Sequence, residues 1–167
     1  MTSITALLHT ENDALRLGRA LETLYACDDI LVIDHSSRDA TARVARAYGA
    51  RVVRARPGAS PGEYVQFMNS DPLNPRWILC LDPRESLTEK LAASLFEWKS
   101  ESRAANWSGV PAFSVFLREE TAQGWVEHPA AQTRLVPQSW KLWKGVLPVH
   151  ESAALVLEGE LLRFAFP

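Results

Sequence analysis

The first half of the chain alternates between short apolar runs and segments in which apolar residues recur every three or four positions. The apolar runs predict β-strands at 4–8, 30–33, 51–54 and 77–81. The segments between them predict amphipathic helices that begin near Asp13 and near Asp39. Strands that alternate with helices in this way are typical of βαβ units. We therefore expect an α/β fold, with a Rossmann-like, mostly parallel sheet flanked by helices.

Two further segments carry local signals for a loop and for a helix start. The segment 54–63 contains two prolines and two glycines, which predicts a loop, and a short helix is expected after it at 63–68. Ser86 and Glu89 have the spacing of a capping box, which predicts a helix that begins at Ser86. Its apolar face would consist of Leu87, Leu91, Leu95 and Trp98.

Composition narrows the class of protein. The chain has 167 residues, of which 47% are hydrophobic and 23% charged, with a net charge of −2, as in a folded globular protein. Such a balance offers no broad basic surface, so we expect no nucleic-acid partner. Cys27 and Cys80 form no CxxC pair, which favours a reduced, cytoplasmic setting. No apolar stretch approaches the roughly 20 residues that span a bilayer, so any membrane contact is expected to be peripheral, at the inner face.

Polar residues come directly after three of the predicted strands, at 9–12, 34–39 and 82–85. In an open α/β sheet, ligands bind where the parallel strands end. Carboxylates at such positions can accept hydrogen bonds from a base or a ribose, and serine hydroxyls and helix N-terminal N–H groups suit oxygen-rich ligands. The pattern therefore favours a nucleotide site at this edge of the sheet.

Two alternatives to that site stay open on the residues alone. Ser37 and Asp39 are also suitable caps for the second helix, and Asp34 is a suitable turn residue. A nucleotidyltransferase or another Rossmann-like nucleotide binder is compatible with the βαβ pattern as well. However, no GxGxxG motif and no P-loop follows a predicted strand, which argues against a dinucleotide site and a P-loop site.

Three separated segments resemble family 2 glycosyltransferases, particularly those that add sugars to lipopolysaccharide cores. That family has a Thr-x-Asn-Glu-like turn and a Val-Val-Asp-x-x-Ser-x-Asp-x-Thr strand end, which are matched here at 10–13 and 32–41. The segment 77–92 is similar to the family's strand carrying Asp-x-Asp-Glu. The segment 133–159 is similar to its Arg-Leu-Phe to Val-His-Glu region and places there Arg134, Leu135, Val149, His150 and Glu151.

The resemblance implies a GT-A fold and the inverting transfer of a sugar from a nucleotide-diphosphate sugar to a glycan or lipid-linked acceptor, as in cell-envelope polysaccharide synthesis. It implies these donor-binding residues: Thr10, Asn12, Asp34, Ser36, Asp39 and Asp82. Arg84 is added to the donor-binding set because its guanidinium can contact the diphosphate. Transfer with inversion needs a base that takes the proton of the acceptor hydroxyl. Glu151 is the first candidate for that base, with Glu120 or Glu127 as alternatives, and His150 would meet the diphosphate or a metal.

The remainder of the chain fits one domain. Strand-like patterns at 112–117 and 133–136 follow the helical half, and no internal repeat is present. We expect a single GT-A-like domain over 1–167, in which 1–100 form the nucleotide-binding half and 101–167 the acceptor side.

Arg84 departs from the family pattern. The family has a carboxylate there that ligates a divalent cation, whereas arginine repels a cation and offers it no lone pair. Asp82 and Glu85 would then hold Mg²⁺ or Mn²⁺ only weakly. A guanidinium can instead neutralise charge on the leaving diphosphate. Two interpretations remain open, namely a transferase that needs no metal and a catalytically inactive relative that binds a nucleotide or a partner.

Overall fold

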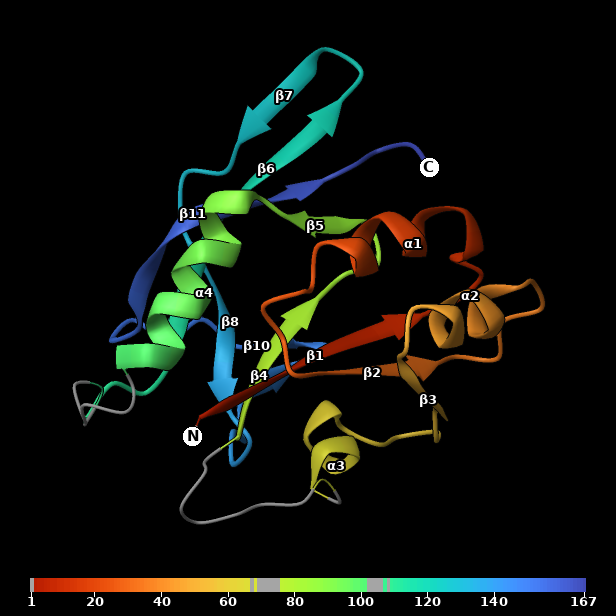
Figure 1. Ribbon diagram of the computed structural model, residues 1–167, viewed down its shortest axis with the longest axis horizontal. Coiled ribbons are helices and arrows are strands. Elements are labelled where there is room, and N and C mark those ends of the chain that lie inside the picture. The colour runs from red at the N-terminus through yellow and green to blue at the C-terminus, as the bar shows by residue number, and fades with distance from the viewer. Residues whose placement is uncertain (1, 67, 69–75, 102–106, 108) are drawn as a thin grey trace.

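The computed structural model describes residues 2–66, 68, 76–101, 107 and 109–167. Its first half consists of parallel strands and helices, as expected (Figure 1). The elements of this half are β1 (Ser3–Thr10), α1 (Ala14–Glu22), β2 (Asp29–Asp34), α2 (Thr41–Ala47), β3 (Arg51–Arg54), α3 (Pro61–Val65) and β4 (Arg76–Leu81). Strand β1 pairs in parallel with both β2 and β4, and β2 pairs in parallel with β3.

The second half extends the same sheet with mixed strand directions. Its elements are β5 (Glu85–Leu87), α4 (Glu89–Glu101), β6 (Phe113–Thr121), β7 (Gly124–Glu127), β8 (Gln132–Pro137), β9 (Trp143–Lys144), β10 (Leu147–Pro148) and β11 (Leu155–Arg163). Within the described residues, nine strands form one sheet in the order β3-β2-β1-β4-β8-β6-β11-β5, with β7 beside β6. Strand β8 runs antiparallel to β4, and β9 and β10 form a separate ribbon. The predicted α/β fold is confirmed.

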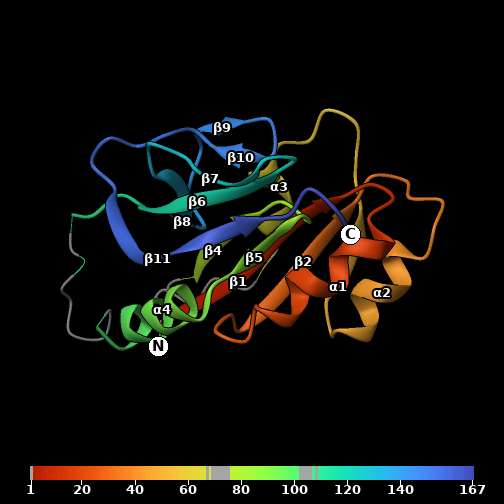
Figure 2. The ribbon, with the colours of Figure 1, turned by 90° about the horizontal axis from the view of Figure 1, so that it is seen from above.

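The central strands are largely apolar because both faces of the sheet are covered. Ile4, Ala6 and Leu8 of β1 pack with residues of α1, α2 and α4 on one face. Leu7 points to the other face, where it belongs to a core with α3 and with Trp143 of the β9–β10 ribbon. Figure 2 shows α1, α2 and α4 on one side of the sheet and that ribbon on the other. This packing leaves the carboxyl ends of the strands accessible.

The register of the sheet brings those ends together. Thr10 of β1 lies opposite Asp34 of β2, and Asp34 lies opposite Arg54 of β3. Leu81, the last residue of β4, lies opposite Leu8 of β1. The polar residues that follow these strands therefore share one edge of the sheet, as predicted.

The helix predicted from Ser86 begins later. Residues Glu85–Leu87 form strand β5, which pairs with β11, and α4 starts at Glu89. The cap is Thr88, whose Oγ1 accepts a hydrogen bond from the Leu91 N–H at 3.2 Å. The capping-box prediction was therefore wrong, because pairing with a strand from the end of the chain outweighs the local signal.

One other helix start and one strand differ from the sequence-based expectation. Helix α3 begins at Pro61 rather than 63, because Ser60 and Glu63 form a capping box in which the Ser60 N–H donates to Glu63 Oε2 at 2.5 Å. Residue 67, within the expected helix at 63–68, lies outside the described residues. Strand β11 was not expected. It contains a bulge near Gly159, whose φ of +92° favours glycine and where a Cβ would lie 2.3 Å from the Leu91 nitrogen.

No helix of the described part of the chain is long and apolar enough to cross a membrane.

Candidate functional site

The loops after β1 and β2 are joined by hydrogen bonds to the Asp34 carboxylate. Thr10 Oγ1 and Ser37 Oγ donate to Asp34 Oδ1 at 2.8 and 2.5 Å, and the Ser37 N–H donates to Oδ2 at 3.0 Å. Burial raises the pKa of Asp34, but the hydrogen bonds from Ser37 and Thr10 outweigh it, so the pKa lies below its ordinary value. Asp34 is therefore an ionised acceptor held in one orientation.

Backbone conformation adds to this arrangement. Among the described residues, the two non-glycine residues with positive φ are Asn12 at 53° and Ser36 at 59°. The Asn12 N–H donates to Ser37 Oγ at 2.9 Å, and Asn12 Oδ1 accepts from the Arg38 N–H at 2.8 Å. Such conformations persist where surrounding contacts enforce them and are frequent in ligand-binding loops. The two loops thus hold each other in place.

Asp39 fastens these loops to both following helices. It accepts hydrogen bonds from the Thr41 N–H at 2.9 Å, from Thr41 Oγ1, and from the Ala14 N–H at 3.2 Å. The hydrogen bond from the Thr41 hydroxyl is the main cause that lowers the pKa of Asp39. Asp39 does not line the cavity described next. Its hydrogen bonds instead hold the starts of α1 and α2, which agrees with the capping interpretation.

A cavity of about 300 Å³ opens at the carboxyl ends of β1, β2 and β4, and we call it the strand-end cavity. Thr10, Asp82 and Arg84, all expected to bind the donor, line it. Its other lining residues are His9, Glu11, Asp13, His35, Pro83 and Val146. The other four predicted donor-binding residues, Asn12, Asp34, Ser36 and Asp39, do not line this cavity but lie at the end of β2 and in the loops after β1 and β2 that border it.

Asp82 and Arg84 form a bidentate ion pair in this cavity. Arg84 Nε lies 2.9 Å from Asp82 Oδ1, and Arg84 Nη2 lies 3.0 Å from Oδ2. Burial raises the pKa of Asp82, yet the hydrogen bonds and charge of Arg84 lower it below its ordinary value. The same pairing raises the pKa of Arg84. Both carboxylate oxygens thus already contact a cation that belongs to the chain.

Glu85, expected as a weak metal ligand, has a different role. It is fully buried and accepts hydrogen bonds from two arginines, Arg134 at 2.7 and 2.9 Å and Arg163 at 3.0 Å. Its Oε1 also accepts from the Asp82 N–H at 2.7 Å. With Glu85 engaged and Asp82 paired, the expected metal site does not suit Mg²⁺ or Mn²⁺. The described residues include no group of three or more His, Cys, Asp or Glu side chains that could hold a metal ion.

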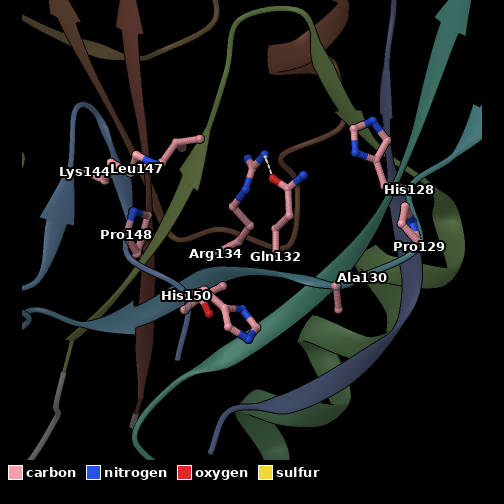
Figure 3. A pocket seen from close by; sticks show the side chains of 11 residues that line it. His128, Pro129, Ala130, Gln132, Arg134, Lys144, Leu147, Pro148 and His150 are labelled. Carbon is pink, nitrogen blue, oxygen red and sulfur yellow. Dashed lines mark hydrogen bonds between the residues drawn. The ribbon is translucent and has the colours of Figure 1, made fainter. Parts of the chain in front are cut away.

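His150 and Glu151 lie outside the strand-end cavity. His150 lines a second cavity of about 630 Å³, which we call the basic cavity, between β8, the β9–β10 ribbon and the segment around His128 (Figure 3). Glu151 lines neither cavity. Its carboxylate accepts from the Ala153 N–H at 3.0 Å, and its own N–H donates to Thr133 Oγ1 at 2.9 Å. The structure therefore does not bring these two residues together with Asp82.

The turn between β9 and β10 relates the two cavities. Val146 in this turn lines the strand-end cavity, whereas Lys144 and Leu147 on either side of it line the basic cavity. The cavities are therefore neighbours across a single turn.

Comparison with known proteins gives relatives in sequence and in structure. No protein-family model matches the chain. Among solved structures, glucosyl-3-phosphoglycerate synthase from Mycobacterium tuberculosis, crystallised with Mn²⁺, UDP and glucosyl-3-phosphoglycerate, is 20% identical with a TM-score of 0.49, over 70% of this chain and 44% of that one. Mannosyl-3-phosphoglycerate synthase from Rubrobacter xylanophilus is 21% identical with a TM-score of 0.47, over 71% and 39%.

Curated proteins with similar sequences have a higher sequence identity to this chain than these two structures have. An uncharacterized glycosyltransferase of Rickettsia felis is 33% identical over 92 residues, which cover 54% of this chain and 32% of the relative. One of Rickettsia prowazekii is 29% identical over 92 residues, covering 54% and 31%. Over about half of its length, the chain is therefore similar in sequence to proteins named glycosyltransferases. The matched part spans about a third of the length of these relatives.

One feature of the strand-end cavity was not anticipated from the sequence. His9 and His35, which had no assigned role, both line the strand-end cavity, with His9 Nδ1 lying 2.9 Å from His35 Nε2. Burial, with a smaller effect of His35, lowers the pKa of His9 to about 4, so its imidazole is neutral near pH 7. Their positions in the sequence could have indicated this contact, because His9 and His35 lie at the ends of adjacent parallel strands.

Proposed function

We propose that this chain binds a nucleotide-diphosphate sugar in the strand-end cavity and transfers the sugar, with inversion, to a glycan or lipid-linked acceptor. The relation to glycosyltransferases supports sugar transfer in general. The observation that carries the finer proposal is the convergence of Thr10, Asp34 and Asp82 at the ends of three adjacent strands. We also propose that 1–100 supply the donor half and 101–167 the acceptor side of one domain.

The donor's nucleoside is assigned to the Thr10–Asp34 end of the site. Asp34 Oδ1 already accepts two hydrogen bonds, but within the described residues Oδ2 accepts one, from the Ser37 N–H. Oδ2 therefore keeps a lone pair for a base N–H or a ribose hydroxyl. Asn12, Ser36 and Asp39 fix the loops that hold Thr10 and Asp34 in this geometry.

The diphosphate is assigned to Arg84. As the bond between the anomeric carbon and the diphosphate oxygen breaks, negative charge grows on the leaving group, and a guanidinium stabilises it. Two unit charges about 4 Å apart interact by roughly 4 kcal/mol at an effective dielectric constant near 20, before desolvation. Asp82 holds Arg84 from the other side and so sets its orientation. No metal is needed for this role.

The acceptor's proton is assigned to His150. The acceptor oxygen attacks the anomeric carbon, and its proton passes to a general base. Glu151 was expected as this base, but its carboxylate accepts from a backbone N–H in its own turn. His150, expected to meet the diphosphate or a metal, lines a cavity instead. Glu151 then fixes the backbone beside the base.

The test is hydrolytic release of the nucleoside diphosphate from UDP-glucose and from GDP-mannose, with water in place of the acceptor, measured without added metal. Asp34→Asn is expected to abolish release. Asp29→Asn, at the opposite end of the same strand, serves as the matched control and should retain it, with the folding of both variants checked by thermal unfolding. Binding of the nucleotide without any release would indicate the inactive relative. No binding by any nucleotide would contradict the proposal.

A further inference from the structure

The basic cavity has an unusual charge pattern for a chain whose net charge is negative. Its lining contains Arg134, Lys144, His128 and His150 but no aspartate or glutamate. Arg134 is neutralised by the buried Glu85, and His128 Nε2 lies 2.8 Å from Glu119 Oε2. Lys144 forms no ion pair with any described residue. It therefore contributes a positive charge that no described residue neutralises.

Gln132 adds a fixed hydrogen-bond donor. Its Oε1 accepts from Arg134 Nη2 at 2.8 Å, as Figure 3 shows. Because the amide oxygen is occupied, the amide NH₂ is the group that remains for a ligand. Arg134 is in turn held by the Glu85 carboxylate and by the Cys80 carbonyl at 3.1 Å. This donor is therefore oriented before any ligand arrives.

Size and location suit a substrate of the same reaction. The volume of about 630 Å³ lies in the range of small-molecule sites, and part of the wall is apolar, with Pro129, Ala130, Leu147 and Pro148. Figure 3 shows Lys144 and His128 on opposite sides, with Arg134 and Gln132 between them. A short chain of contacts leads from this cavity to the donor site, because the Glu85 carboxylate that holds Arg134 also accepts from the Asp82 N–H.

We propose that the basic cavity binds the sugar acceptor through a phosphoryl group, held by the Lys144 ammonium and the Gln132 amide NH₂. This inference rests on the proposed function and names the chemical class of its acceptor. The group could belong to a soluble sugar phosphate or to a lipid-linked phosphate, since both present the same anionic oxygens. His150 remains beside it as the base for the acceptor hydroxyl.

The experiment compares probes that differ in the phosphoryl group alone. Calorimetric titration of the full chain with glucose 6-phosphate is expected to give binding at least about tenfold tighter than with glucose. Lys144→Gln should remove most of that difference, whereas Lys141→Gln should preserve it. Lys141 is the matched control because it is exposed in the same segment but lines neither cavity. An unchanged preference in Lys144→Gln would overturn the proposal. Equal binding of both probes, together with no vesicle retention that depends on Lys144, would overturn it as well.

A second arm distinguishes the two sources. Phosphatidylcholine vesicles with and without phosphatidic acid are tested by sedimentation. Retention on the acidic vesicles that Lys144→Gln abolishes, without binding of glucose 6-phosphate, assigns the group to a lipid. Titration with UDP separates the two proposals. Binding of UDP, with neither a preference for glucose 6-phosphate nor Lys144-dependent retention on acidic vesicles, overturns this inference alone. Either of these phosphoryl effects without nucleotide binding overturns the proposed function and leaves an anion site.

Discussion

Arg84 faces Asp82 with two parallel hydrogen bonds, at 2.9 and 3.0 Å, in the cavity where the parallel strands end. In the family that the sequence resembles, this position carries a carboxylate that ligates a divalent cation. Here the cation is part of the chain and its partner carboxylate is already paired. The pair therefore supplies one fixed positive group, oriented by Asp82, rather than a site for a metal ion.

We expect nucleotide binding that needs no metal and depends on Arg84. Arg84→Ala should weaken UDP binding about tenfold without metal, because a charge-assisted hydrogen bond to phosphate is lost. Arg84→Asp should make binding depend on Mn²⁺, since two carboxylates then face the cavity. Calorimetry with and without Mn²⁺ measures both effects.

Arg46→Ala is the matched control for this experiment, because Arg46 is exposed on α2 and lines neither cavity. Its UDP affinity should equal that of the wild type. Wild-type binding that requires Mn²⁺ would show that Arg84 does not replace the ion.

The strand-end site could be predicted because it depends on local pattern and on a simple rule of topology. Thr10, Asp34 and Asp82 each follow an apolar run, and parallel strands end at one edge of a sheet. The capping function of Asp39 was also one of two interpretations open from the sequence. These features depend only on contacts between neighbouring elements, namely adjacent strands of the sheet and the helices that follow them.

Other features could not be predicted because they depend on contacts between distant segments. Glu85 pairs with Arg134 and Arg163, 49 and 78 positions away, so its sequence neighbours give no sign of its burial. For the same reason Ser86 suggested a helix start where a strand pairs with β11. His150 was assigned from resemblance, and no local pattern indicated which cavity it lines.

The buried Glu85 ion pairs make a stability prediction. Glu85→Gln leaves the buried Arg134 without its anion and Arg163 with Glu119 alone, and we expect a loss of about 3–5 kcal/mol in the free energy of unfolding. Urea denaturation measures it. The exposed Glu97→Gln on α4 is the control and should change stability by less than about 0.5 kcal/mol. A loss as small as that of the control would show that Glu85 is not buried as described.

His9 predicts a pH dependence of stability in a defined window. Its pKa falls from 6.5 to about 4 on folding, so below pH 6.5 the unfolded chain binds the proton more readily. Stability contributed by neutral His9 is thus lost as the pH falls from 6.5 towards 4, by roughly 3 kcal/mol at most. His9→Gln should flatten this part of the curve, as measured by urea denaturation at several pH values.

Asp34 and Asp82 act in a separate, more acidic window. Their pKa values are lowered on folding, so the stability that they contribute is present above the unfolded value of 3.8 and is lost as the pH falls through the folded value. An unchanged slope between pH 6.5 and 4 in His9→Gln would therefore contradict the assignment to His9.

The central claim is that the strand-end cavity binds a sugar nucleotide, and isothermal titration of UDP and GDP, without metal, tests it most directly. We expect saturable binding of at least one nucleotide to the wild type and to Asp29→Asn. The affinity of Asp34→Asn for that nucleotide should be lower by about tenfold or more. Absence of binding by either nucleotide, or equal affinity in Asp34→Asn and the wild type, would contradict it.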